Sequence, residues 1–335
     1  SLAGDALTVA ESNVAVGTGA LGTETKGSRN IAIGENSLLA QNNTTASSPY
    51  NVAIGYNSGK AVTTGRQNTI IGSLAGDALT VADYNVALGY FALSSDTLGS
   101  ASTAIGRSAL RDQNFTTATD VFNVAVGYEA GLSVTTGIRN TLIGGLAGDA
   151  LTDADLNVAV GYSALDNDTQ GSKSVSIGAF ALGQQNFTTA TDNYNVGVGY
   201  AAGNAITTGV GNTLIGGVAG DALTDADDNI AIGQGSLTND TLGSKSVAIG
   251  RSALSVQNFT TATDTYNVAL GYHAGVAVTT GRLNTLIGGL AGGALTTGDN
   301  NVAIGYAALS TEDAHGNNVA IGRQALQNQN AGAEA

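Results

Sequence analysis

The sequence predicts an all-β fold, a single-stranded β-solenoid built from 17-residue and 21-residue coils. The pattern Asn-Val-Ala-Val-Gly at 13–17 occurs, with variations, eighteen times along the chain. A 17-residue spacing of the closing glycines is interrupted by a 21-residue spacing, which returns with a 72-residue period, as the first of them show: Gly17, Gly34, Gly55, Gly72 and Gly89. Fixed periods of this size are typical of solenoids, in which each repeat packs mainly on its neighbours.

The 72-residue period divides the chain into similar copies of four coils each, so we expect one continuous repeat domain over 1–335. The copies are 1–72, 73–144, 145–216, 217–288 and a partial fifth at 289–335. The first ten residues, 1–10, return unchanged at 73–82, so the chain starts on a repeat boundary and without Met. We interpret the chain as a segment of a longer protein.

The residues before each glycine predict a three-residue strand. Counting back from the glycine, position −1 is Val, Ile or Leu, position −3 is Val, Ile or Thr, and position −2 is mostly Ala. This alternation of β-forming residues is typical of a strand, with −3 and −1 on one face. We expect −3 and −1 to fill a thin interior together with leucines near position +4, such as Leu93, Leu110 and Leu165.

Position −2 then faces the other way, and its composition indicates that this second face is buried as well. It is small in most coils but large in every fourth coil, at Ile70, Leu142, Leu214 and Leu286. A thin interior barely offsets the cost of ordering the backbone. We therefore expect the alanine face to pack against identical chains, and the periodicity predicts self-association without fixing the number of chains.

Two polar positions complete each coil. Position −4 is Asn in fifteen units and Ser in three, and position +8 is Thr in most coils. Stacked coils would align these side chains in columns, each bonding the next, with about 4.8 Å of rise per coil.

Composition excludes several classes of function. The formal net charge is −14 and the twelve Lys and Arg are scattered, which argues against nucleic acid and anionic membranes as partners. No apolar run is long enough for membrane insertion, and there is no Cys for disulfides or thiolate metal sites. His273 and His315 do not recur, and no paired base activates a nucleophile, so we expect no enzyme activity and no cofactor. The segment 17–22 matches a dinucleotide fingerprint in letters only, because the helix and βαβ unit it requires are not predicted.

The repeated units, such as 51–56, 246–254 and 301–309, resemble the head repeats of trimeric autotransporter adhesins (YadA-like heads) and the repeats of phage tail fibres. The resemblance covers the whole chain and implies a left-handed β-roll in a parallel homotrimer. It also implies an extracellular location, on a cell surface or in a virion fibre. The unit lengths of 17 and 21 differ from the shorter adhesin repeat. The function expected is that of a rigid structural and adhesive fibre segment.

In copies two to four the 21-residue coil contains an inserted loop, Gln-Asn-Phe-Thr-Thr-Ala-Thr-Asp, at 113–120, 185–192 and 257–264, and in copy one this loop is degenerate. One interpretation is a row of loops that binds a cell-surface glycan or protein receptor. The other is that each Phe folds back over the coil interior or into the interchain seam. The candidate ligand-contact residues are Phe115, Thr116, Thr117, Phe187, Thr188, Thr189, Phe259, Thr260 and Thr261.

Two alternative functions are kept. The segment 144–151, with Asp153 and Asp155 nearby, is similar to a calcium-binding repeat, so a calcium-responsive β-roll is one alternative function. The simpler interpretation is that these aspartates lie in solvated turns. Ice binding by the Thr column would require a pair of threonines on every coil. Within each 72-residue copy, however, a Thr-Thr pair recurs at that column only in the last of the four coils. No metal site is predicted.

Overall fold

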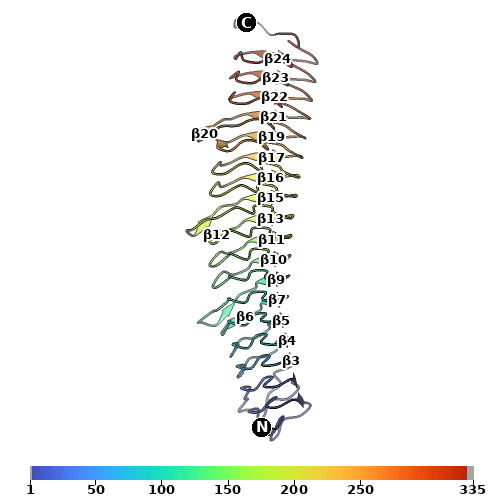
Figure 1. The fold of residues 1–335 in the computed structure, drawn as a ribbon, viewed down its shortest axis with the longest axis vertical. Helices are drawn as coiled ribbons and strands as arrows, with labels where there is room; N and C mark the ends of the chain where they lie inside the picture. Colours follow the sequence, from blue (N-terminus) through green and yellow to red (C-terminus); the bar gives the residue numbers. More distant parts are fainter. Residues whose placement is uncertain (1, 330–335) are drawn as a thin grey trace. The chain divides into compact units, whose positions relative to one another are not determined.

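The computed structural model describes residues 2–329 and is all-β, which confirms the predicted solenoid. Each closing glycine follows a three-residue strand, and within each unit a strand pairs in parallel with the strand one coil away. The strands lie one above another within each of two units, residues 1–170 and 171–335, which are built in the same way (Figure 1). Among the described residues, no helix is long and apolar enough to cross a membrane. The single continuous domain and the left-handed winding stay predictions.

In the first unit, neighbouring solenoid strands pair in register, so that Val14 lies beside Ile31 and Ile31 beside Val52. The second coil of the second copy also carries a short strand that pairs with one in the inserted loop, as β6 with β8. The strands are β1 (Val14–Val16), β2 (Ile31–Ile33), β3 (Val52–Ile54), β4 (Thr69–Ile71), β5 (Val86–Leu88), β6 (Gly99–Ser100), β7 (Thr103–Ile105), β8 (Thr119–Asp120), β9 (Val124–Val126), β10 (Thr141–Ile143) and β11 (Val158–Val160).

The second unit repeats this arrangement, with two inserted loops whose short strands pair as β12 with β14 and β18 with β20. The strands are β12 (Gly171–Ser172), β13 (Val175–Ile177), β14 (Thr191–Asp192), β15 (Val196–Val198), β16 (Thr213–Ile215), β17 (Ile230–Ile232), β18 (Gly243–Ser244), β19 (Val247–Ile249), β20 (Thr263–Asp264), β21 (Val268–Leu270), β22 (Thr285–Ile287), β23 (Val302–Ile304) and β24 (Val319–Ile321).

The closing glycines are required by the approach of successive coils. Gly106 has a φ of +134°, and a Cβ atom there would lie 2.1 Å from the carbonyl oxygen of Gly127 in the next coil. Gly127 has the same relation to Gly144, at 2.3 Å. No other residue fits this turn, because both the backbone conformation and the space exclude a side chain.

The expected assignment of the two strand faces is wrong. Position −2 points into the coil, since Ala53, Ile70 and Ala159 have no exposed surface. Positions −3 and −1 face outward and are partly exposed, as in Val52 and Ile54 of β3. The alternation of a strand does not itself say which face is inside, and the interior here is too narrow for two β-branched side chains per coil.

The large residues at every fourth −2 position fill space inside the coil. Ile70 lies against Gly59 and Gly76, where an added Cβ would be 3.0 Å and 3.4 Å from its Cδ1. Leu142 has the same relation to Gly131 and Gly148, at 2.7 Å and 2.8 Å. Large and small residues therefore complement each other along the interior, which explains why Ile and Leu recur there.

Both predicted polar columns are confirmed. The N–H of Asn68 donates to Oδ1 of Asn51 at 2.9 Å, and that of Asn85 donates to Oδ1 of Asn68 at 2.9 Å. In the second column, the hydroxyl of Thr63 donates to the carbonyl of Thr80 at 3.2 Å, and that of Thr80 to the carbonyl of Thr97 at 3.0 Å. The asparagine bonds satisfy polar groups that are buried inside the coils.

Candidate functional site

The outward side of the strands forms an apolar face, defined here as positions −3 and −1 of the solenoid strands within each unit. The −1 residues are aliphatic and many are substantially exposed, for example Leu88 at 41% and Leu270 at 43%. No charged residue occupies position −3 or −1 in any coil. An exposed apolar face of this kind is uncommon in a soluble monomer and is typical of interaction surfaces.

Rows of aromatic side chains border the apolar face. Tyrosines at position +1 follow many closing glycines, with exposures between 46% for Tyr90 and 62% for Tyr200. A second row lies at position −5, with Tyr50, Tyr194 and Tyr266 about half exposed. These rings combine apolar surface with a hydroxyl group, which suits the margin of an interface.

Basic residues stack on the second aromatic row. The guanidinium of Arg29 lies 5.7 Å from the ring centre of Tyr50, and Nζ of Lys173 lies 5.2 Å from that of Tyr194. Lys173 also pairs with Asp192 at 2.5 Å. The cation and the ring come from successive coils, so these contacts join the 17-residue coil to the 21-residue coil that follows it.

The predicted ligand-contact residues divide into two groups. Phe115, Phe187 and Phe259 are buried, each with 6% exposure, as the alternative interpretation expected. The paired threonines remain exposed at the loop tips: Thr116, Thr117, Thr188, Thr189, Thr260 and Thr261. The phenylalanines therefore offer almost no surface to a ligand, and only the threonines remain available for contact.

A buried carboxylate that the sequence patterns did not reveal anchors each inserted loop. Asp96 has no exposed surface, and its Oδ1 accepts N–H bonds from Gly99 at 3.0 Å and Phe115 at 3.1 Å. Gln113 Nε2 donates to Asp96 Oδ2 at 2.6 Å, while its Oε1 accepts a bond from Asn123 at 2.9 Å.

The signal that could have found this network is an acid that recurs with the 72-residue period of the copies. These acids are Glu24, Asp96, Asp168, Asp240 and Glu312. A glutamine stands at the matching place of the coil that follows each acid, at Gln41, Gln113, Gln185, Gln257 and Gln329.

Hydrogen bonding keeps such a carboxylate charged. Burial of Glu24 disfavours its ionised form, but donors from Asn43, Gln41 and the N–H of Gly27 outweigh that cost and lower its pKa. A buried charge held by this many donors fixes geometry, and it is not available for acid–base chemistry.

A different carboxylate pair has the opposite behaviour. Burial and the neighbouring charge of Asp166 raise the pKa of Asp149 to about 6. Its Oδ1 atom is buried and accepts no hydrogen bond in the part of the chain described. Asp149 and Asp166 occupy the same position of successive coils, so like charges lie close together there.

The aspartates suggested for calcium cap the adjacent coil instead. Asp153 Oδ1 accepts a bond from the hydroxyl of Thr136 at 2.6 Å, and Asp155 Oδ1 accepts the N–H of Ile138 at 2.7 Å. Over residues 2–329, the only cluster of three potential metal ligands is Glu312, Asp313 and His315. The calcium-responsive β-roll stays a prediction, because these hydrogen bonds leave the second oxygen of each carboxylate out of account.

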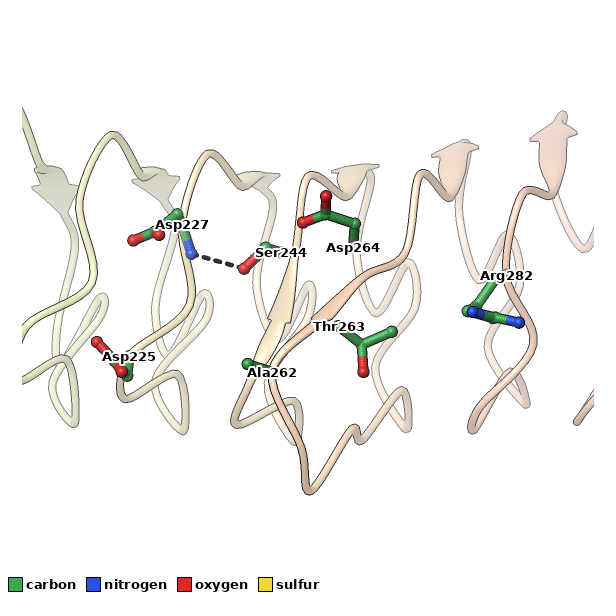
Figure 2. A pocket seen from close by; sticks show the side chains of 7 residues that line it. All are labelled: Asp225, Asp227, Ser244, Ala262, Thr263, Asp264 and Arg282. Atoms are coloured by element: carbon green, nitrogen blue, oxygen red, sulfur yellow. Dashed lines mark hydrogen bonds between the residues drawn. The ribbon is translucent and has the colours of Figure 1, made fainter.

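An open groove of about 680 Å³ lies beside the inserted loop of the fourth copy (Figure 2). Its carboxylates already hold neighbouring groups, since Thr208 donates to Asp225 at 2.6 Å and the N–H of Val210 donates to Asp227 at 2.8 Å. Their second oxygens and the half-exposed Arg282 could bond the hydroxyls of a ligand. The groove is lined by Asp225, Asp227, Ser244, Ala262, Thr263, Asp264 and Arg282.

Comparison with known proteins gives no match to a family model, a curated protein or a solved structure.

Proposed function

We propose that the chain is a structural segment of an extracellular fibre, in which identical chains pack side by side through the apolar face. The observation that carries this proposal is the uncharged, partly exposed surface of Val, Ile and Leu at position −1 and of Val, Ile and Thr at position −3. The alanine face assigned to this role from sequence is interior, so the proposed contact moves to the opposite side of the strands.

A second copy of the chain is the partner that fits this face best. Successive strands present nearly the same side chains at every coil, so only a surface with the same spacing can match many of them in turn. A parallel copy has that spacing by construction, and a symmetric assembly buries the same face on every chain. The resemblance to trimeric fibres supplies the number three.

Attachment to a surface is the second part of the proposal. The exposed threonine pairs recur once per 72-residue copy, and the groove of the fourth copy lies beside one inserted loop. Weak contacts repeated along an assembly add up through avidity. A glycan or protein receptor on a cell surface is the partner class proposed, and the chain itself acts as a passive display scaffold.

The oligomeric state tests the proposal directly. Sedimentation equilibrium should give a mass about three times the 33.1 kDa of one chain. Leu88→Asp combined with Leu270→Asp places charges on the apolar face in both units and should yield monomers with an unchanged far-UV spectrum. Thr117→Asp at an exposed loop tip is the matched control and should remain assembled.

A wild-type protein that sediments as a folded 33.1 kDa monomer at micromolar concentration would contradict the assembly. Glycan-array binding by the assembled wild type, weakened in a variant with Thr116, Thr117, Thr188 and Thr189 replaced by alanine, tests attachment separately. Unchanged binding in that variant would remove the loops from the proposal.

A further inference from the structure

The last described repeat departs from the buried-carboxylate arrangement at one turn. In the four earlier copies, the residue three positions after the buried acid is glycine, as in Gly99 after Asp96 and Gly243 after Asp240. In the fifth copy this residue is His315, which follows Glu312. Asp313 also replaces the threonine that follows the acid in every other copy.

The earlier glycines leave room for a carboxylate oxygen. An added Cβ at Gly99 would lie 2.2 Å from Asp96 Oδ2, and one at Gly243 would lie 2.2 Å from Asp240 Oδ2. Because His315 has a Cβ, the same oxygen of Glu312 cannot occupy the equivalent place. The change at this residue therefore alters how the buried acid is satisfied.

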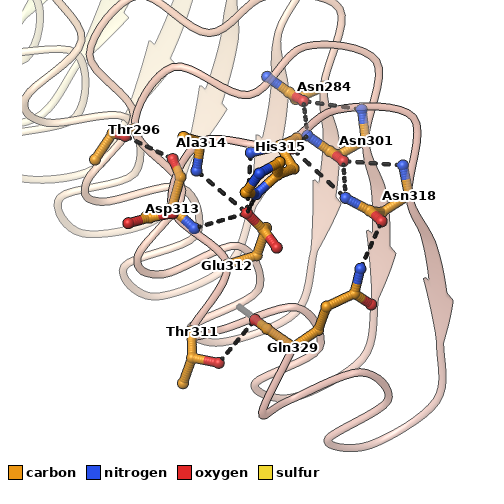
Figure 3. Close-up of polar contacts among 10 residues, drawn as sticks. All are labelled: Asn284, Thr296, Asn301, Thr311, Glu312, Asp313, Ala314, His315, Asn318 and Gln329. Carbon is orange, nitrogen blue, oxygen red and sulfur yellow. Dashed lines mark hydrogen bonds and ion pairs between the residues drawn. The ribbon is translucent and has the colours of Figure 1, made fainter. Parts of the chain in front are cut away.

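Glu312 is left with one unused oxygen. Its side chain has no exposed surface, yet Oε2 has no hydrogen-bond partner within residues 2–329, whereas Oε2 of Glu24 accepts bonds from Gln41 at 2.9 Å and Asn43 at 2.7 Å. Gln329, the counterpart of Gln41, donates instead to Asn318 at 3.0 Å (Figure 3). An unpaired buried carboxylate oxygen is costly and indicates that a positively charged group belongs beside it.

The same turn supplies two further ligands. The ligand atoms of Glu312, Asp313 and His315 all lie within 4.8 Å of one another. His315 Nδ1 lies 2.8 Å from Glu312 Oε1, in a contact that holds the imidazole beside the carboxylate, and the ring would turn from this contact to an ion when one binds. Asp313 is exposed and His315 is partly exposed, so an ion could enter from solvent.

We propose that Glu312, Asp313 and His315 form a site for a transition-metal dication of the zinc type. The backbone N–H groups of Asp313, Ala314 and His315 all donate to Glu312 Oε1 at 2.9–3.2 Å, which fixes the carboxylate before an ion arrives. An imidazole with two carboxylates suits Zn²⁺ better than Ca²⁺ or Mg²⁺, which bind through oxygen. Water would complete the coordination.

The repeat itself provides the test variants. His315→Gly and Asp313→Thr restore the residues found in other copies, so the double variant should fold as those copies do. Calorimetric titration of the full chain with ZnCl₂ should show one site per chain in the wild type. The double variant should lose affinity by at least about 100-fold, and His273→Ala, which removes the other histidine, should leave it unchanged.

An independent readout comes from the histidine resonances. Zn²⁺ should shift the imidazole signals of His315 and leave those of His273 in place, while equal Ca²⁺ should shift neither. Absence of a binding isotherm for the wild type at 100-fold zinc excess, or equal binding by the double variant, would overturn the site. Failure of this site would leave the proposed fibre assembly untouched, because the two rest on different residues.

Discussion

Single atoms decide whether successive coils can stack at the closing glycines and the inward alanines. Within each unit, the closing glycine of one coil meets the carbonyl of the next closing glycine, as Gly106 meets Gly127, and most inward alanines lie in a space with no exposed surface. Substitution of a closing glycine or of an inward alanine therefore changes stability through the interior. Substitution at position −1, the residue after the inward alanine, changes the outer face.

Gly106→Ala should lower the free energy of unfolding by at least about 1–3 kcal/mol, because the residue is held at a φ of +134° and its new Cβ meets the carbonyl of Gly127. Urea denaturation followed by circular dichroism measures the change. Gly217→Ala is the matched control, since nothing lies within 4 Å of a Cβ there. Equal midpoints for the two variants would show that the stacked glycines are not the constraint.

The raised pKa of Asp149 predicts that stability falls as pH rises. The folded chain holds its proton up to about pH 6, but the unfolded chain releases it near 3.8, so folding is favoured at the lower pH. The loss between pH 4 and 7 should be on the order of 1–3 kcal/mol. Thermal melts of Asp149→Asn should show a flatter pH profile and a higher Tm at pH 7, with the exposed Asp120→Asn as control. A steeper profile in Asp149→Asn would contradict the assignment.

At the scale of the element, each 21-residue coil is held in place by one buried polar network. Asp96 bonds the loop backbone at Phe115, and Gln113 joins Asp96 to Asn123 of the same coil as Gln113. The loop is thus anchored at its base, while its threonine tip stays exposed. Anchoring and display are separate tasks carried out by neighbouring residues.

Gln113→Leu should lower the free energy of unfolding by about 2–4 kcal/mol, because Asp96 Oδ2 would be left buried without its donor. Chemical denaturation gives the difference from wild type. Gln184→Leu changes an exposed glutamine and should leave stability within about 0.5 kcal/mol. A Gln113→Leu protein as stable as the control would mean that Oδ2 is satisfied by other groups.

The strands and their period followed from the sequence, because glycine spacing and alternating β-formers leave few other solutions. Which face of the strand points inward could not be predicted, because alternation alone does not distinguish the two faces. The interior of the coil is narrow, and this places the small alanine inside. The buried acids were missed because Asp before Thr and Gly is typical of an exposed turn. Their recurrence with a glutamine in the following coil was visible, but its meaning depends on stacking that the linear sequence does not show.

For the whole molecule, the net charge of −14 opposes the proposed assembly, and the uncharged apolar face is the region where that repulsion is weakest. Charge repulsion between copies is screened by salt, whereas apolar contact is not. The two contributions can therefore be separated by ionic strength.

Raising NaCl from 10 to 150 mM should strengthen association of the copies, lowering their dissociation constant several-fold, because the Debye length falls from about 30 Å to about 8 Å. Sedimentation velocity over a concentration series measures this change. The Leu88→Asp and Leu270→Asp variant should stay monomeric at both salt concentrations. Association that weakens with salt would indicate an interface built on ion pairs instead.

The match between Ile70 and its two facing glycines has a consequence for how such a chain can change in length. Removing residues 73–89, which make one 17-residue coil, would set Leu93 where Gly76 now lies against Ile70. A single coil therefore cannot be lost without a clash between these two side chains. Removing 73–144 places another glycine against Ile70, so the large and small residues of the interior still match. We expect the chain without 73–144 to unfold cooperatively on heating and the chain without 73–89 not to do so. Such a chain would then gain or lose length during evolution in whole 72-residue copies of four coils.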